Sequence, residues 1–201
     1  MAVNRRTTLT GETILESLEE LSETLAEFGV RATAYIVGGA AIVLAHRHRT
    51  RTTVDIDALS LDEEQAVLAF ARDLADKRGL ALDWLKTEVK RIIDTSLPED
   101  KNAEVVFESP SLVVTGASAE HLLAMKIKAG RDKDLNDIEF LARKLGVRSF
   151  AEARQVHDAL FPRHEIPEDV RKEIENRFVR IRAKSSYKPP PSARGGRQPE
   201  H

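Results

Sequence analysis

The chain has 201 residues, of which 41% are hydrophobic, a formal net charge of −2 and no cysteine. This composition allows one domain with a sizeable core, and it excludes disulfide bonds, thiolate metal sites and a uniformly basic nucleic-acid-binding protein. Residues 1–10 lack the apolar segment of a signal peptide, and no apolar run approaches the ~20 residues that span a bilayer. We therefore expect a cytoplasmic protein that does not bind membranes.

The first part of the chain has the periodicity of alternating helices and strands. An amphipathic pattern predicts the first helix, and an apolar run that ends in two glycines predicts the first strand. A short apolar helix and a second strand are expected next. These four elements span residues 10–28, 32–37, 40–45 and 54–59, and the glycines are Gly38 and Gly39.

Two aspartates lie on the second predicted strand. Because side chains alternate between the faces of a strand, Asp55 and Asp57 point to one face, with Cα atoms ~6.5–7 Å apart. Such a pair has the chemistry to hold divalent metal ions, and Mg²⁺ prefers carboxylate and phosphate oxygens. We predict that Asp55 and Asp57 bind Mg²⁺. The alternative is that they line the solvent side of a half-buried strand.

The glycine pair predicts a phosphate-binding turn. Gly38 and Gly39 precede a helix, so their backbone N–H groups are open to a triphosphate that would meet no Cβ atom. The order of strand, Gly-Gly, helix and strand with Asp-x-Asp resembles the nucleotidyltransferase fold of the polymerase-beta type. That resemblance implies an α+β protein in which helices flank a mixed β-sheet.

Two more helices and a strand pair are expected in the middle of the chain. Ser60 and Glu63 have the spacing of a capping box for a helix that runs to Lys77. Asp83 is placed to cap the next short helix, and Trp84 is interpreted as a core aromatic residue. That helix and the two strands span residues 82–94, 103–108 and 112–115.

The rest of the chain is predicted to be helical, with a disordered end. Four helices are expected to begin at Ser118, Asp134, Ser149 and Pro167. From Ser185 onward the sequence is rich in proline and glycine and has too few apolar side chains to pack. We therefore divide the chain into a core over residues 1–116, a helical half over 117–184 and a tail over 185–201.

A lysine lies in the apolar stripe of the helix that begins at Ser118. Lys126 must therefore be paired with an acid or extend out of the apolar face. Asp137 borders the apolar stripe of the next helix and is a suitable partner, whereas Asp134 has the position of an N-cap. Two interpretations remain open: a structural ion pair, or a lysine that faces an open cleft and contacts phosphates.

The combination of Lys126, Arg131, Lys133-Asp134 and Asp137 resembles the C-terminal motif of the AbiEii and MenT group of minimal nucleotidyltransferases, the toxin enzymes of toxin–antitoxin pairs. Segments 83–85 and 105–110 resemble a related family of small nucleotidyltransferase-fold proteins, and the whole resemblance spans residues 11–146. Many nucleotidyltransferases have Gly-Ser where this chain has Gly-Gly, so a hydroxyl that would bind a phosphate oxygen is missing. The resemblance implies a phosphate loop at Gly38 and Gly39, metal ligands Asp55 and Asp57, nucleotide contacts from Lys126 and Arg131, and Asp137 as the partner of Lys126.

The same resemblance implies an Mg²⁺-dependent enzyme that transfers a nucleoside monophosphate from a nucleoside triphosphate to an RNA hydroxyl. The expected acceptor is the 3′ end of transfer RNA, and the expected protein partner is an antitoxin. Basic runs at residues 46–51 and 180–197 suit a polyanionic acceptor. Glu104 and Asp83 are the alternatives for a third metal-site carboxylate. The other functions that we consider are a small-molecule nucleotidyltransferase acting on antibiotics and a non-catalytic binding or regulatory protein.

Overall fold

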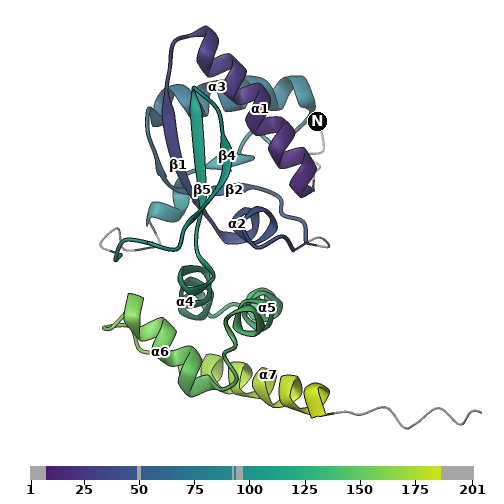
Figure 1. The fold of residues 1–201 in the computed structure, drawn as a ribbon, viewed down its shortest axis with the longest axis vertical. Coiled ribbons are helices and arrows are strands. Elements are labelled where there is room, and N and C mark those ends of the chain that lie inside the picture. Colours follow the sequence, from purple (N-terminus) through teal and green to yellow (C-terminus); the bar gives the residue numbers. More distant parts are fainter. Residues whose placement is uncertain (1–7, 49–50, 92, 94–96, 187–201) are drawn as a thin grey trace, which may run out of the picture.

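The computed structural model describes residues 8–48, 51–91, 93 and 97–186. A mixed β-sheet with flanking helices forms one part of the molecule, and a group of helices forms the other (Figure 1). The predicted α+β class is confirmed. Within the described ranges, no helix has both the length and the apolar character to cross a membrane. Apart from Ser185 and Ser186, the predicted tail lies outside the described residues.

The sheet has five strands in the order β3-β2-β1-β5-β4. The central strand β1 runs parallel to β5 and antiparallel to β2, while β3 is parallel to β2 and β4 is antiparallel to β5. The predicted strand pair at residues 103–115 is confirmed as β4 and β5. The strands are β1 (Ala32–Val37), β2 (Ile56–Leu61), β3 (Leu85–Lys86), β4 (Glu104–Glu108) and β5 (Leu112–Gly116).

One face of the sheet is buried beneath helices, and the other is more open. Alternate residues such as Ile36 and Ile56 are fully buried, and α1 and α3 lie together on that side (Figure 1). Tyr35 and Leu59 belong to the opposite, half-buried face. The short helix α2 follows β1 directly. The helices are α1 (Gly11–Glu27), α2 (Gly38–Leu44) and α3 (Glu64–Arg78).

The helical half follows β5. Ser118 and Ser149 each accept a hydrogen bond from a backbone N–H three residues on, so the predicted N-caps of α4 and α6 are confirmed. Helix α4 packs against α5 and α6, and α7 packs against α5. These helices are α4 (Ala119–Ala129), α5 (Leu135–Leu145), α6 (Phe150–Leu160) and α7 (Glu168–Ser186).

The predicted capping box at Ser60 is wrong. Strand β2 continues to Leu61, and Ser60 pairs with Tyr35 of β1. Helix α3 begins only at Glu64, and Glu63 precedes it in a left-handed conformation with φ 48° and makes no side-chain cap. Pairing with the neighbouring strand therefore extends β2 into the segment that local capping chemistry assigned to the helix.

The predicted helix over residues 82–94 is also wrong. Its place is taken by the two-residue strand β3 and a 3₁₀ helix, Glu88–Arg91. The backbone N–H of Ile56 donates to the carbonyl of Trp84 at 2.6 Å, which joins this segment to the edge of the sheet. Trp84 is fully buried, and its indole N–H donates to the Ala71 carbonyl, so its interpretation as a core residue is confirmed. The described residues of this segment form no α-helix, so the predicted cap at Asp83 is wrong.

Candidate functional site

The two aspartates of the Asp-x-Asp motif share one cation. Asp55 immediately precedes β2 and Asp57 lies within it. The ammonium of Lys86 is hydrogen-bonded to Asp55 and lies 3.7 Å from Oδ1 of Asp57. The alternation expected from the sequence thus brings both carboxylates to one place, although β2 begins and ends two residues later than predicted.

Lys86 is a residue that the sequence analysis missed. It is paired in register with Asp57 across β2 and β3, so the sheet places its side chain beside the carboxylates. Burial alone would lower the pKa of Lys86, but the hydrogen bond to Asp55 and the charges of Asp57 and Asp55 raise it. Lys86 is therefore a fixed positive charge at the carboxylate pair. The sequence does not predict that Lys86 lies beside the aspartates, because residues 82–94 have the pattern of a helix and not of an edge strand.

The glycine pair lies against the same aspartates. Gly38 has φ +68°, and a Cβ atom there would lie 3.1 Å from Oδ2 of Asp57. A Cβ atom on Gly39 would lie only 2.7 Å from the hydroxyl of Thr53. Both positions therefore require glycine, the first for its left-handed backbone and the second for close packing. The structure places the predicted phosphate turn directly beside Asp57.

Lys126 is the centre of a buried charge cluster. Its ammonium lies 2.6 Å from Oδ1 of Asp134 and 2.9 Å from Oδ2 of Asp137. The Lys126 side chain is 7% exposed, and both carboxylates are equally enclosed. The predicted pairing of Lys126 with Asp137 is confirmed, but Lys126 does not face an open cleft. Asp134 lies at the N-cap position before α5, but its side chain makes no capping hydrogen bond, because it contacts Lys126 and Arg131 instead.

Two arginines complete this cluster. Nε of Arg131 lies 2.6 Å from Oδ2 of Asp134, while the rest of its side chain is about half exposed. Nη2 of Arg51 lies 2.9 Å from Oδ2 of Asp137. Burial would raise the pKa of Asp134, but hydrogen bonds from Arg131 and Lys126 hold it below its usual value. Three cations thus surround two carboxylates, which leaves a net positive charge.

That positive charge acts on Asp57. Burial and the neighbouring Asp55 raise the pKa of Asp57, whereas Lys86, Lys126 and Arg131 each lower it. A carboxylate whose ionisation is penalised by burial and by a neighbouring acid is stabilised by an added cation. The donor set therefore fits Mg²⁺, which takes one or two protein carboxylates and fills its remaining positions with phosphate oxygens and water.

Neither alternative for a third carboxylate joins the pair. Glu104 is on β4, and the order of the sheet puts β1 and β5 between β4 and β2, a separation of roughly 14 Å. Asp83 is exposed in the turn before β3. In the parts of the chain that the structure describes, no group of three acidic or histidine side chains is arranged to hold a metal ion. On β3, the strand next to β2, the residue paired with Asp57 is Lys86 and not an acid.

Comparison with known proteins gives one match. A family model described as nucleotidyltransferase of unknown function (DUF6036) matches residues 12–147, about two thirds of the chain. Searches of curated proteins and of solved structures found no match. The matched segment contains both glycines, the Asp-x-Asp motif and the cluster around Lys126. The chain therefore belongs to this family of nucleotidyltransferases.

Proposed function

We propose that this protein transfers a nucleoside monophosphate from a nucleoside triphosphate to an acceptor hydroxyl. The observation that supports this proposal is that Gly38 lies against Asp57 while Gly39 lies close to Arg51 of the Lys126 cluster, so that three separate segments meet here. Such a transfer needs acids that hold a metal ion, backbone N–H groups that phosphates can approach, and nearby cations that stabilise the charge on the phosphates. A non-catalytic scaffold has no use for their combination.

Each group has a task in the proposed reaction. Asp55 and Asp57 would hold Mg²⁺, which supplies charge neutralisation for the triphosphate. Gly38 and Gly39 let the phosphates approach the backbone, and the half-exposed guanidinium of Arg131 is available for phosphate oxygens. Lys126, which is buried, would hold Asp134 and Asp137 in place and add its charge to the cationic cluster that favours the phosphates.

The bond changes define the reaction. The acceptor oxygen attacks the α-phosphorus, the bond from that phosphorus to the pyrophosphate oxygen breaks, and the hydroxyl proton passes to solvent. Catalysis of such a transfer requires positioning and charge stabilisation more than covalent chemistry. The described site is built mainly of fixed charges and is suited to that task.

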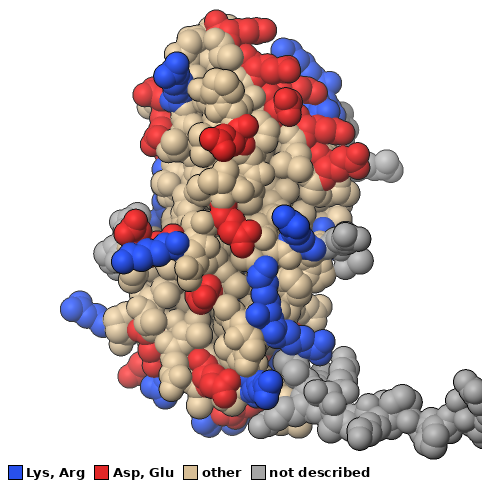
Figure 2. Space-filling view, viewed as in Figure 1, with Lys and Arg blue, Asp and Glu red and all other residues tan. Residues whose placement is uncertain are grey.

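For the acceptor we propose RNA, with the 3′ end of transfer RNA as the first candidate, and for the partner an antitoxin. Support comes from the resemblance of the segment from Lys126 to Asp137 to toxin nucleotidyltransferases. The surface charge limits where RNA can bind. Helix α1 carries six glutamates and no lysine or arginine, and acidic side chains line the surface over this helix (Figure 2). RNA would therefore approach from the side of Arg51 and Arg131.

The test uses the position of the label. The protein is incubated with Mg²⁺, total RNA and each nucleoside triphosphate, labelled at either the α- or the γ-phosphate. We expect the α-label to enter RNA and the γ-label to leave as pyrophosphate. If neither label enters RNA but the α-label enters an added aminoglycoside, the small-molecule function replaces ours. If no acceptor is labelled and nucleotide still binds, the protein is a binding module.

A change at Lys86 should alter metal binding. Lys86→Met removes the ammonium that competes with Mg²⁺ for Asp55 and Asp57. A partly exposed charge pair contributes about 1 kcal/mol, so Mg²⁺ should bind on the order of fivefold more tightly once the pair is lost. Lys86 also lowers the pKa of Asp57. Its removal raises that pKa further, so the pH below which metal binding fails should move upward.

Calorimetric Mg²⁺ titration between pH 5 and 8 measures both effects. The matched control is Lys90→Met, which removes a lysine paired with Glu64 away from the aspartates. Its metal affinity and pH profile should equal those of the unmodified protein. Weaker Mg²⁺ binding in Lys86→Met would show that the lysine supports the metal site and does not compete with it.

A further inference from the structure

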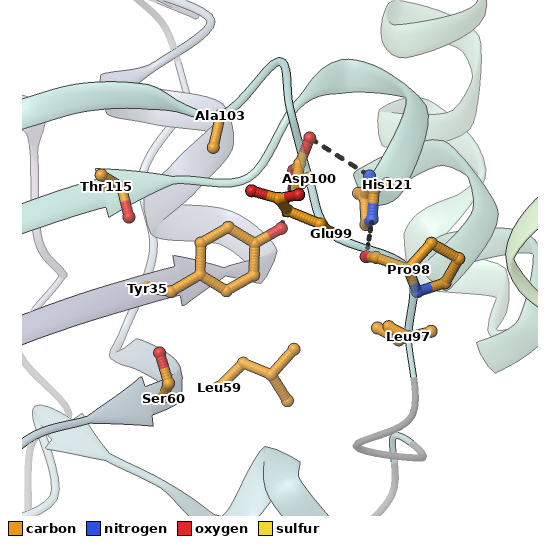
Figure 3. Close-up of a pocket in the computed structure, with 10 residues that line it drawn as sticks. All are labelled: Tyr35, Leu59, Ser60, Leu97, Pro98, Glu99, Asp100, Ala103, Thr115 and His121. Atoms are coloured by element: carbon orange, nitrogen blue, oxygen red, sulfur yellow. Dashed lines mark hydrogen bonds and ion pairs between the residues drawn. The ribbon is translucent and has the colours of Figure 1, made fainter.

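A cleft of about 550 Å³ opens on the less covered face of the sheet. Its floor comes from β1, β2 and β5, and its wall is the segment that enters β4. Figure 3 shows the ring of Tyr35 and the side chains of Leu59 and Leu97 around a common space. Its volume is that of a small-molecule site. The sequence does not predict this cleft, because the residues that line it come from separated segments of the chain.

The cleft lies next to the carboxylate pair. Leu59 is two residues after Asp57 on β2, so both side chains belong to one face of the sheet, roughly 7 Å apart along the strand. Gly38, the first residue of α2, lies against Asp57, and the positive charges of Lys126 and Arg131 act on Asp57. A molecule in the cleft and a triphosphate at Gly38 would therefore reach the aspartates from different directions.

The charge of the lining excludes a phosphate group. None of the described residues that line the cleft is lysine or arginine, and two are acids, Glu99 and Asp100. Asp100 is already satisfied: it accepts hydrogen bonds from the Tyr35 hydroxyl at 2.7 Å and the Ser118 backbone at 2.8 Å, and Nδ1 of His121 lies 3.3 Å from its Oδ1. A triphosphate here would meet negative charge with no lysine or arginine among the described lining residues to offset it.

Glu99 is the carboxylate of the cleft lining that can still accept a hydrogen bond from a ligand. It forms no hydrogen bond or ion pair with any other described residue, while its neighbour Asp100 fixes the loop to Tyr35 and α4. A carboxylate is well suited to accept from the exocyclic amino group of a nucleobase. Tyr35 and Leu59 supply apolar surface of the kind on which a flat base packs. The lining thus suits an uncharged ring with an amino group.

We propose that this cleft binds the terminal nucleoside of the acceptor and prefers a base with an exocyclic amino group, as in adenosine or cytidine. The inference rests on the proposed transfer reaction. It assigns the triphosphate to Gly38 and Arg131 and the acceptor's last base to Tyr35 and Glu99. Uridine presents a carbonyl oxygen where the others present the amino group, so it would be repelled by Glu99.

The first experiment uses RNA oligonucleotides that differ only in the 3′ nucleoside. At saturating nucleoside triphosphate, the KM for acceptors ending in adenosine or cytidine should be about tenfold lower than for uridine. In Glu99→Gln this difference should shrink, because the amide both donates and accepts. Glu108→Gln, which changes an exposed acid outside the cleft, should leave the difference as it is. Equal KM values for all oligonucleotides would overturn the inference.

The second experiment fills the cleft. Ala103→Leu should raise the KM for the acceptor and leave the KM for the nucleoside triphosphate unchanged. If the triphosphate KM rises instead, the cleft holds the base of the donor and the inference is wrong.

Free ligands separate failure of this inference from failure of the proposed function. By NMR titration, adenosine and cytidine should bind the unmodified protein more tightly than uridine, and Ala103→Leu should abolish this binding. That result with no transfer to RNA would reject the transfer reaction and keep the nucleoside site. Binding of glucosamine but of no nucleoside would reject the site, because its ligand would then be a cationic sugar.

Discussion

Asp57→Asn should abolish nucleotide transfer while leaving the fold as stable as before. The carboxylate is partly buried beside Asp55, which raises the cost of ionising Asp57, so its neutralisation removes repulsion and strands no charge. Lys86 keeps its hydrogen bond to Asp55. Loss of a metal ligand should remove about 4 kcal/mol of transition-state stabilisation, a rate decrease of roughly 10³-fold. Labelled transfer and thermal unfolding measure the two effects.

The matched control for this variant is Glu104→Gln. It removes an acid from the far edge of the sheet, where it is separated from Asp57 by two strands, so transfer should be unchanged. Ordinary turnover in Asp57→Asn would remove the metal-site assignment. A large loss in Glu104→Gln would show that the third carboxylate reaches the site after all.

Lys126→Met should produce the largest loss of stability. The ammonium is buried between Asp134 and Asp137, and methionine keeps the apolar stem but leaves both carboxylates short of one cation. Breaking a buried ion pair from one side costs about 3–5 kcal/mol. Arg51 and Arg131 still contact the acids, so we expect the lower end of that range. Denaturant unfolding gives the change in the free energy of unfolding.

Two further variants make this expectation specific. Lys133→Met removes an exposed lysine nearby and should leave stability unchanged. Combining Lys126→Met with Asp134→Asn should recover part of the lost stability, because one of the stranded carboxylates is neutralised. Unchanged unfolding in Lys126→Met together with lost transfer would show that the lysine acts only on the nucleotide, as in the open-cleft interpretation.

The sequence determined those features whose causes are local. Side-chain alternation put Asp55 and Asp57 on one face, and the serine caps at Ser118 and Ser149 fixed where α4 and α6 begin. Burial of a lysine in an apolar stripe demanded an acidic partner, and Asp137 was identifiable from helical periodicity. Each of these inferences depends on residues of one element or of two consecutive helices.

The tertiary structure decided what depends on pairing between distant segments. Hydrogen bonding to β1 carried β2 through Ser60, and pairing with β2 turned Leu85 and Lys86 into an edge strand in place of a helix. Backbone bonds between strands outweighed local propensity there, as is usual for sheet edges. The same long-range pairing placed Lys86 at the aspartates, and loop packing brought Arg51 to Asp137. No short-range pattern encodes those neighbours, because these contacts join side chains 29 or more residues apart.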